Sequence, residues 1–104
     1  MNWNPSEHVK KLEAEISAKE AEISAKGWAV NKWTGGGVWT AEKEIGDGVK
    51  LVADEDGWSL CDADGYPLGN VEAYTFDRQQ AAAVVELMID IFRLRRAIAS
   101  ISAQ

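Results

Sequence analysis

A long amphipathic segment at the C-terminal end constrains the fold more than any other feature of this chain. It opens at Asp77, whose carboxylate is a good helix N-cap, and Gln80 follows three residues later, as in a capping box. Up to Phe92 the apolar side chains cover roughly 220° of the helix circumference, and after Arg93 they narrow to one stripe. We therefore expect a helix over 77–101. Its first half should be buried on several sides and its second half should face one partner helix.

The first 26 residues predict another helix, over 5–26. Asn4 or Ser6 can cap its start, and Gly27 stands just past its end. Its apolar residues form a narrow stripe, which is typical of a helix that packs against a single other helix. The expected partner is the narrow half of the C-terminal helix, in the same chain or in a second copy. For a homodimer, the predicted oligomer interface consists of Ile16, Ile23, Leu94, Ile98 and Ile101.

Between the two helices the hydrophobic period changes to two, which indicates β-strands. Short strands are expected near 28–33, 38–45, 49–54 and 57–61, with a less regular one from Tyr66. Pro67 indicates that this last stretch is an edge or a loop. Glycine and aspartate residues at 35–37, 46–48, 56–57 and 64–65 have the chemistry of hairpin turns.

Such short connections join antiparallel neighbours and leave no room for parallel crossovers. The predicted fold class is therefore α+β in a single domain, 1–104. An N-terminal helix precedes an antiparallel four- to five-stranded β-meander over 28–76, and a long C-terminal helix packs on the sheet.

One seven-residue pattern, Asp-x-Asp-Gly-aromatic-x-Leu, occurs twice, at 54–60 and at 62–68. The spacing predicts two successive hairpin corners, each followed by an inward-pointing aromatic residue and a leucine. The carboxylates are similar to the start of a calcium loop, but the third acidic ligand before the glycine and the glutamate at the twelfth position are missing. We therefore expect structural turns without a metal ion.

Other catalytic or cofactor-binding patterns are weak. His8 and Cys61 are the only histidine and the only cysteine, whereas zinc takes about four such ligands. The stretch 34–38 is rich in glycine but lacks the Lys-Ser/Thr ending of a phosphate-binding loop. We expect no catalytic residue, no metal and no cofactor, and hence no enzyme.

Length, hydropathy and cysteine content favour a cytoplasmic protein. No apolar run approaches the roughly 18 residues that a membrane span needs. The N-terminus shows neither a basic nor an apolar region of a secretory signal. A single cysteine excludes an internal disulfide and fits a reducing compartment.

The negative charge is concentrated in the middle of the chain. Residues 27–76 carry three lysines and nine acidic residues, a net charge of −6 that equals the net charge of the whole chain. A nucleic-acid-binding protein normally shows a prominent basic surface, and the cluster Arg93, Arg95 and Arg96 is too small to provide one. We therefore expect neither direct nucleic-acid binding nor a membrane partner.

The middle segment also contains the candidate binding residues. Carboxylates on a rigid face can substitute for phosphates in a basic groove and steer association, and tryptophan is enriched at interface hot spots. The odd spacing of Trp28 and Trp33 in a regular strand would place at least one of them off the core face. The same residues also fit a solubilising surface and core packing. The predicted partner-binding set is Glu42, Glu44, Asp54, Glu55, Asp56, Asp62, Asp64, Trp33 and Trp39.

Two functional hypotheses follow. In the first, the chain is a non-enzymatic inhibitor that docks its acidic surface on a basic, nucleic-acid-binding site of a partner protein. Small acidic phage proteins that block bacterial nucleic-acid-directed defence, including anti-CRISPR proteins, are similar to it in size and charge. In the second, the chain is a homo-oligomeric structural or adaptor protein that assembles through its helices.

Overall fold

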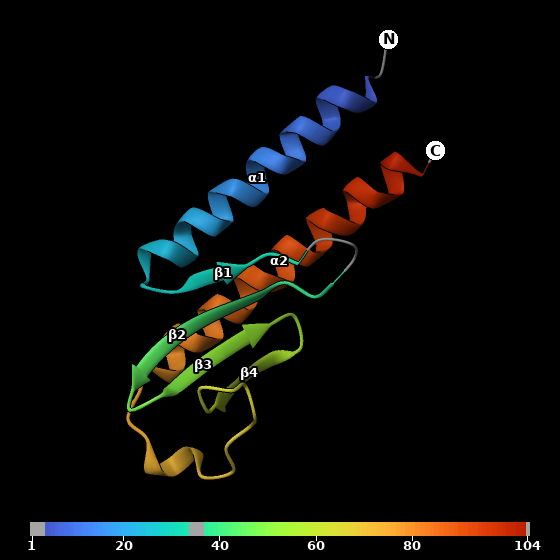
Figure 1. The fold of residues 1–104 in the computed structure, drawn as a ribbon. Helices are drawn as coiled ribbons and strands as arrows, with labels where there is room; N and C mark the ends of the chain where they lie inside the picture. The colour runs from blue at the N-terminus through green and yellow to red at the C-terminus, as the bar shows by residue number, and fades with distance from the viewer. Residues whose placement is uncertain (1–3, 34–36, 104) are drawn as a thin grey trace.

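The computed structural model describes residues 4–33 and 37–103, and it confirms the predicted α+β fold (Figure 1). A four-stranded antiparallel sheet with strand order β1-β2-β3-β4 lies between two helices in the chain. The elements are α1 (Pro5–Ala25), β1 (Ala29–Asn31), β2 (Thr40–Gly46), β3 (Val49–Asp54), β4 (Gly57–Cys61), the 3-10 turn η1 (Val71–Ala73) and α2 (Arg78–Ser102). The predicted glycine turn at 35–37 lies, except for Gly37, outside the described residues.

Helix α1 begins and ends where its flanking residues dictate. Of the two predicted caps, Asn4 takes the role, and its side-chain oxygen accepts from the backbone N–H groups of Ser6 at 3.0 Å and Glu7 at 3.5 Å. These bonds satisfy two of the donors that the first helical turn leaves free. Gly27, just past the end, has a φ of +86°, which favours glycine and turns the chain into β1.

Helix α2 starts at its predicted cap, but the predicted capping box is wrong. The Asp77 carboxylate accepts from the backbone N–H of Gln80 at 2.9 Å. The Gln80 side-chain oxygen instead accepts from Trp28 Nε1 and Lys43 Nζ, both at 2.9 Å. Trp28 is buried in the core, and its Nε1 has no other acceptor among the described residues, so the tertiary bonds take precedence over the local one.

The core lies between α2 and one face of the sheet. The predicted change of character along α2 is confirmed, since its fully buried residues all precede Phe92 and those beyond are half-buried or exposed. The buried residues of α2 are Ala81, Val84, Leu87, Met88 and Ile91. On the sheet side, the buried residues include Ala41, Val49, Leu51, Ala53 and Leu60.

The two helices pack against each other within one chain. They run antiparallel, and the free end of each projects past the sheet on the same side (Figure 1). The molecule is accordingly elongated, with principal extents of 58 × 24 × 16 Å. Within the part of the chain that the structure describes, no helix is both long and apolar enough to cross a bilayer.

The other face of the sheet has no helix over it within the described residues (Figure 1). Strand β3 shows the alternation that separates the two faces. Its residues Val49, Leu51 and Ala53 are buried, whereas Lys50 and Val52 between them are half-buried. We call this second side the outer face.

The chain after β4 departs from the predicted fifth strand. Only one bridge pairs it with the sheet, between Cys61 and Pro67, before η1 leads into α2. The prediction from Pro67 that this stretch is an edge or a loop is therefore confirmed. The prediction that Tyr66 points inward is wrong, because its side chain is 70% exposed.

Candidate functional site

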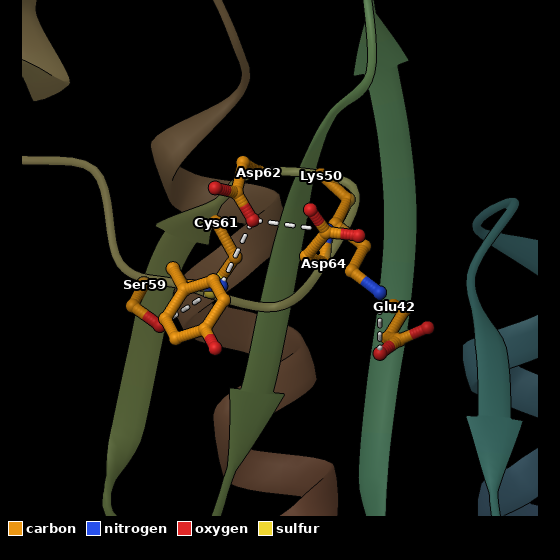
Figure 2. A network of polar contacts seen from close by, with 7 residues as sticks. Glu42, Lys50, Ser59, Cys61, Asp62 and Asp64 are labelled. Carbon is orange, nitrogen blue, oxygen red and sulfur yellow. Dashed lines mark hydrogen bonds and ion pairs between the residues drawn. The ribbon is translucent and has the colours of Figure 1, made fainter.

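The acidic residues of β2 lie on the outer face. Glu42 and Glu44 alternate along the strand with the inward-facing Ala41 and Lys43. The Glu42 carboxylate forms an ion pair with Lys50 Nζ at 3.2 Å across the β2–β3 pair (Figure 2). Glu44 lies opposite Lys50 in the strand register, is exposed and makes no ion pair within the described residues.

The turn after β4 brings two further carboxylates to the same place. Asp62 Oδ1 accepts from the backbone N–H groups of Asp64 at 2.9 Å and Tyr66 at 3.0 Å. These bonds fold the turn back so that Asp62 and Asp64 lie near Lys50 (Figure 2). A cavity of about 340 Å³ lies between this turn and strands β2 and β3. It is lined by Ala29, Glu42, Glu44, Gly48, Lys50 and the turn residue Ala63.

Four of the seven predicted acidic residues thus lie at one end of the outer face, on the strand beside Lys50 or in the turn that follows its strand partner Cys61. We call this group, Glu42, Glu44, Asp62 and Asp64 with Lys50, the outer-face patch. Asp47, at the tip of the β2–β3 hairpin, is exposed and adds a further negative charge at this end of the sheet. Antiparallel strands place these residues together because the β2–β3 hairpin and the chain after β4 reach the same end of the sheet.

The other three predicted acidic residues lie elsewhere. Asp54, Glu55 and Asp56 form the β3–β4 turn, at the opposite end of the strands from the outer-face patch. The Asp54 carboxylate accepts from the backbone N–H of Asp56 at 2.8 Å, as in an Asx turn. Glu55 lies near Arg95 of α2. Burial lowers the pKa of the Arg95 guanidinium, and the negative charge of Glu55 opposes this with a smaller raising effect. The structure therefore does not bring the predicted acidic residues into one continuous surface.

The two predicted aromatic anchors lie with this second group. Trp39 is half-buried, and its Nε1 donates to the backbone oxygen of Trp33 at 3.2 Å. The Arg95 guanidinium lies 4.2 Å from the centroid of the Trp39 ring, and Lys32 Nζ lies 5.6 Å from it. Trp39 is therefore held in place by two cations, whereas Trp33 is 61% exposed. Trp28, by contrast, lies in the core and is 3% exposed, so one of the two tryptophans lies off the core face as predicted.

A groove between the helices adjoins Trp39. Its volume is about 370 Å³, and its lining combines apolar side chains with Glu13, Glu20, Lys32 and Arg95. Lys32 Nζ forms an ion pair with Glu20 at 2.7 Å, which ties the end of β1 to α1. Sequence analysis missed the roles of Lys32 and Arg95. No local pattern indicates them, because the Arg95 bond to the Gly37 oxygen (3.2 Å) joins residues 58 positions apart.

The residues of the predicted oligomer interface pack mainly within one chain. Ile16 is 6% exposed and Ile23 is fully buried. Leu94 and Ile98 are half-buried against the same core, and Ile101 is half-buried near the projecting helix ends. The two narrow stripes therefore meet in a single copy of the chain, and whether a second copy packs on Leu94, Ile98 and Ile101 stays a prediction.

Titratable groups that could support chemistry are dispersed. Cys61 is buried on β4 with its Sγ 3.6 Å from the Ser59 hydroxyl oxygen (Figure 2), and His8 lies on α1. Among the described residues, no group of three or more His, Cys, Asp and Glu side chains is arranged to hold a metal ion. Comparison of the chain with protein-family models, curated proteins and solved structures finds no match.

Proposed function

We propose that this chain is a non-enzymatic protein-binding module that acts in the cytoplasm and docks the outer-face patch on a basic surface of a partner protein. The observation that supports it is the position of Glu42 and Glu44 beside Lys50, next to the turn that carries Asp62 and Asp64, on a sheet face that no helix of the described residues covers. Four carboxylates against one ammonium leave a local excess of negative charge. Such an excess attracts a basic partner and raises the rate of association.

A nucleic-acid-binding site is the partner surface that this patch fits best in charge. Phosphate-binding grooves present clustered lysines and arginines, and rigid carboxylates can occupy the positions of the phosphates. The Asp62 carboxylate is fixed by its two backbone bonds, and that of Glu42 by its ion pair with Lys50. Fixed carboxylates lose less conformational entropy on binding than mobile ones. In this proposal the chain is an inhibitor of the anti-CRISPR or other phage anti-defence type.

The test is an affinity pull-down from bacterial lysate with the full chain as bait. Retained proteins are identified by mass spectrometry after washing at about 0.1 M and about 1 M salt, where the Debye length falls from about 10 Å to about 3 Å. We expect a nucleic-acid-binding protein to be held at the lower salt concentration and released at the higher one.

A matched pair of variants assigns the binding to the patch. Glu44→Lys reverses an exposed charge in the patch, and Glu22→Lys makes the same change on an exposed position of α1. The first variant should lose most of the retained partner, and the second should keep it. Equal retention by both variants would rule out docking through the outer-face patch.

A further inference from the structure

Large exposed hydrophobic side chains lie at two opposite ends of the sheet. Among the described residues they are Trp33 (61% exposed), Val38 (50%) and Tyr66 (70%). Trp33 and Val38 belong to the connection between β1 and β2, and Tyr66 belongs to the turn after β4. Strands β2, β3 and β4 run between these two ends (Figure 1).

The first end combines an apolar cavity with positive charge. We call this cavity, of about 280 Å³, the arginine cavity; it is lined by Gly37, Val38, Glu55, Phe92, Arg95, Arg96 and Ala99. The Arg96 guanidinium lies 5.7 Å from the Phe92 ring centroid and forms no ion pair within the described residues. Glu55 is the one acidic residue in this lining, against two arginines. An aromatic side chain accompanied by carboxylates matches such a cavity.

The second end carries that combination. Tyr66 follows Asp62 and Asp64 in a turn whose backbone is fixed by two hydrogen bonds. The Tyr66 backbone N–H donates to the Asp62 carboxylate, and the Tyr66 backbone oxygen accepts from the Asp62 backbone N–H at 2.9 Å. The Tyr66 side chain projects from this rigid turn. We call Asp62, Asp64 and Tyr66 the tyrosine turn. Tyrosine and arginine are both enriched at interface hot spots.

We propose that copies of this chain associate head to tail, with the tyrosine turn of one copy seated on the arginine cavity of the next. The phenol ring would contact Val38 and Phe92, while the two carboxylates face the two guanidinium groups. Charge complementarity and the exposed apolar residues on both surfaces identify a second copy as the occupant. Because the two surfaces differ and lie at opposite ends, each copy keeps one free surface, and the contact generates open chains unless the rotation closes a ring.

This inference does not rest on the proposed function, because it needs no foreign partner and does not use Glu42 or Glu44. It does have a consequence for that function. Asp62 and Asp64 belong to both surfaces, so self-association and docking on a basic partner would compete. A chain that assembles alone and captures nothing from lysate would support self-association and count against the inhibitor.

The test is sedimentation velocity of the purified full chain over a range of concentrations. At about 0.1 M salt we expect the mean mass to rise with concentration beyond that of a dimer. At about 1 M salt it should fall towards the monomer, because the charge pairs are screened. A chain that stays monomeric throughout, or whose mass stops at a dimer, would overturn the proposal.

Two variants that each damage one surface make the test specific. Tyr66→Ala removes the ring and Arg96→Glu reverses a cavity charge, and each should weaken self-association by about tenfold or more. A mixture of the two variants has one intact surface of each kind and should form dimers and nothing larger. Lys11→Glu, with the same charge change as Arg96→Glu on an exposed position of α1, should assemble like the original chain.

Circular dichroism verifies that each variant is folded. If Tyr66→Ala does not fold, Asp64→Lys tests the same end, because the Asp64 side chain accepts no hydrogen bond and forms no ion pair within the described residues. Assembly that neither end variant weakens, or a mixture that behaves like the single variants, would exclude the head-to-tail contact.

Discussion

The two copies of the Asp-x-Asp-Gly-aromatic-x-Leu pattern share a local turn but differ in their surroundings. In both, the first aspartate accepts from the backbone N–H two residues later, at 2.8 Å for Asp54 and 2.9 Å for Asp62. In the first copy the chain then continues as β4, which is paired with β3 along its length. In the second copy the chain makes a single bridge to the sheet.

The side chains that follow these turns have opposite environments. Trp58 packs on the core with its ring 5.2 Å from that of Phe76, and Leu60 is 1% exposed. In the second copy, Tyr66 is 70% exposed and Leu68 is half-buried. A shared Asp-x-Asp-Gly turn therefore does not decide whether the next residues join the sheet. Strand formation also depends on whether a neighbouring strand has an unpaired edge. In the second copy it is further limited by Pro67, which has no backbone N–H to donate to a neighbouring strand.

The largest expected difference between the two copies concerns their leucines. Leu60→Ala should lower the free energy of unfolding by about 2–5 kcal/mol, because the cavity would lie in the closed core under α2. Leu68→Ala should cost less than about 2 kcal/mol, because Leu68 is half-buried and part of its surroundings is solvent. Urea denaturation followed by circular dichroism measures both. Equal losses would mean that the second copy is as deeply packed as the first.

The aromatic residues should differ next. Trp58→Ala should cost about 2 kcal/mol, because it removes a half-buried ring and its edge-on contact with Phe76. Tyr66→Ala should change stability by no more than about 0.5 kcal/mol, as is usual for an exposed position. The same denaturation experiment gives both values. A large loss in Tyr66→Ala would show that this ring packs on the molecule.

For the aspartates that form the turns, the substitution in the second copy should cause the larger loss of stability. Asp62→Ala should cost about 1–2 kcal/mol, because two backbone N–H groups lose their acceptor. Asp54→Ala, which removes one such bond, should cost about 0.5–1 kcal/mol. Asn at either position keeps an acceptor oxygen and serves as the control. If Asp54→Ala proved the more damaging, the count of hydrogen bonds would not explain the turns.

The smallest effect is expected at Pro67. The bonds from the Asp62 N–H to the Tyr66 oxygen and from the Leu68 N–H to the Leu60 oxygen flank this residue. Pro67→Ala should therefore leave them intact and cost no more than about 1 kcal/mol, mainly through the freer unfolded chain. Thermal unfolding checks this. A clear gain in stability would show that the proline prevents further strand pairing.

Much of the fold could be predicted from local patterns. The caps Asn4 and Asp77, the change of hydrophobic period after Gly27 and the turn glycines define the helices, the four strands and their antiparallel order. These features rest on interactions between residues a few positions apart, which the sequence displays directly. The pairing of the two helices follows from their narrow apolar stripes, although the stripes alone left open whether they meet in one chain.

The candidate site could be predicted only in part. The acidic residues and tryptophans are visible in the sequence, but their division into two groups is not. Asp54 to Asp56 and Asp62 to Asp64 are eight positions apart, yet β4 carries the chain from one end of the sheet to the other between them. A strand advances about 3.3 Å per residue, so its five residues separate the two groups by roughly 15 Å.

Local patterns along the chain suffice to predict the elements, their order and the negative charge of the middle segment. Only the tertiary structure decided that Gln80 serves Trp28 and Lys43 rather than its own helix, that Arg95 holds Trp39, and that Tyr66 faces solvent. In the first two cases, a side chain forms the contact that satisfies its own buried or polar atoms best, and its partners come from distant segments that meet only when the chain has folded. Tyr66 faces solvent because the chain after β4 makes a single bridge to the sheet and does not continue as a strand of the described fold.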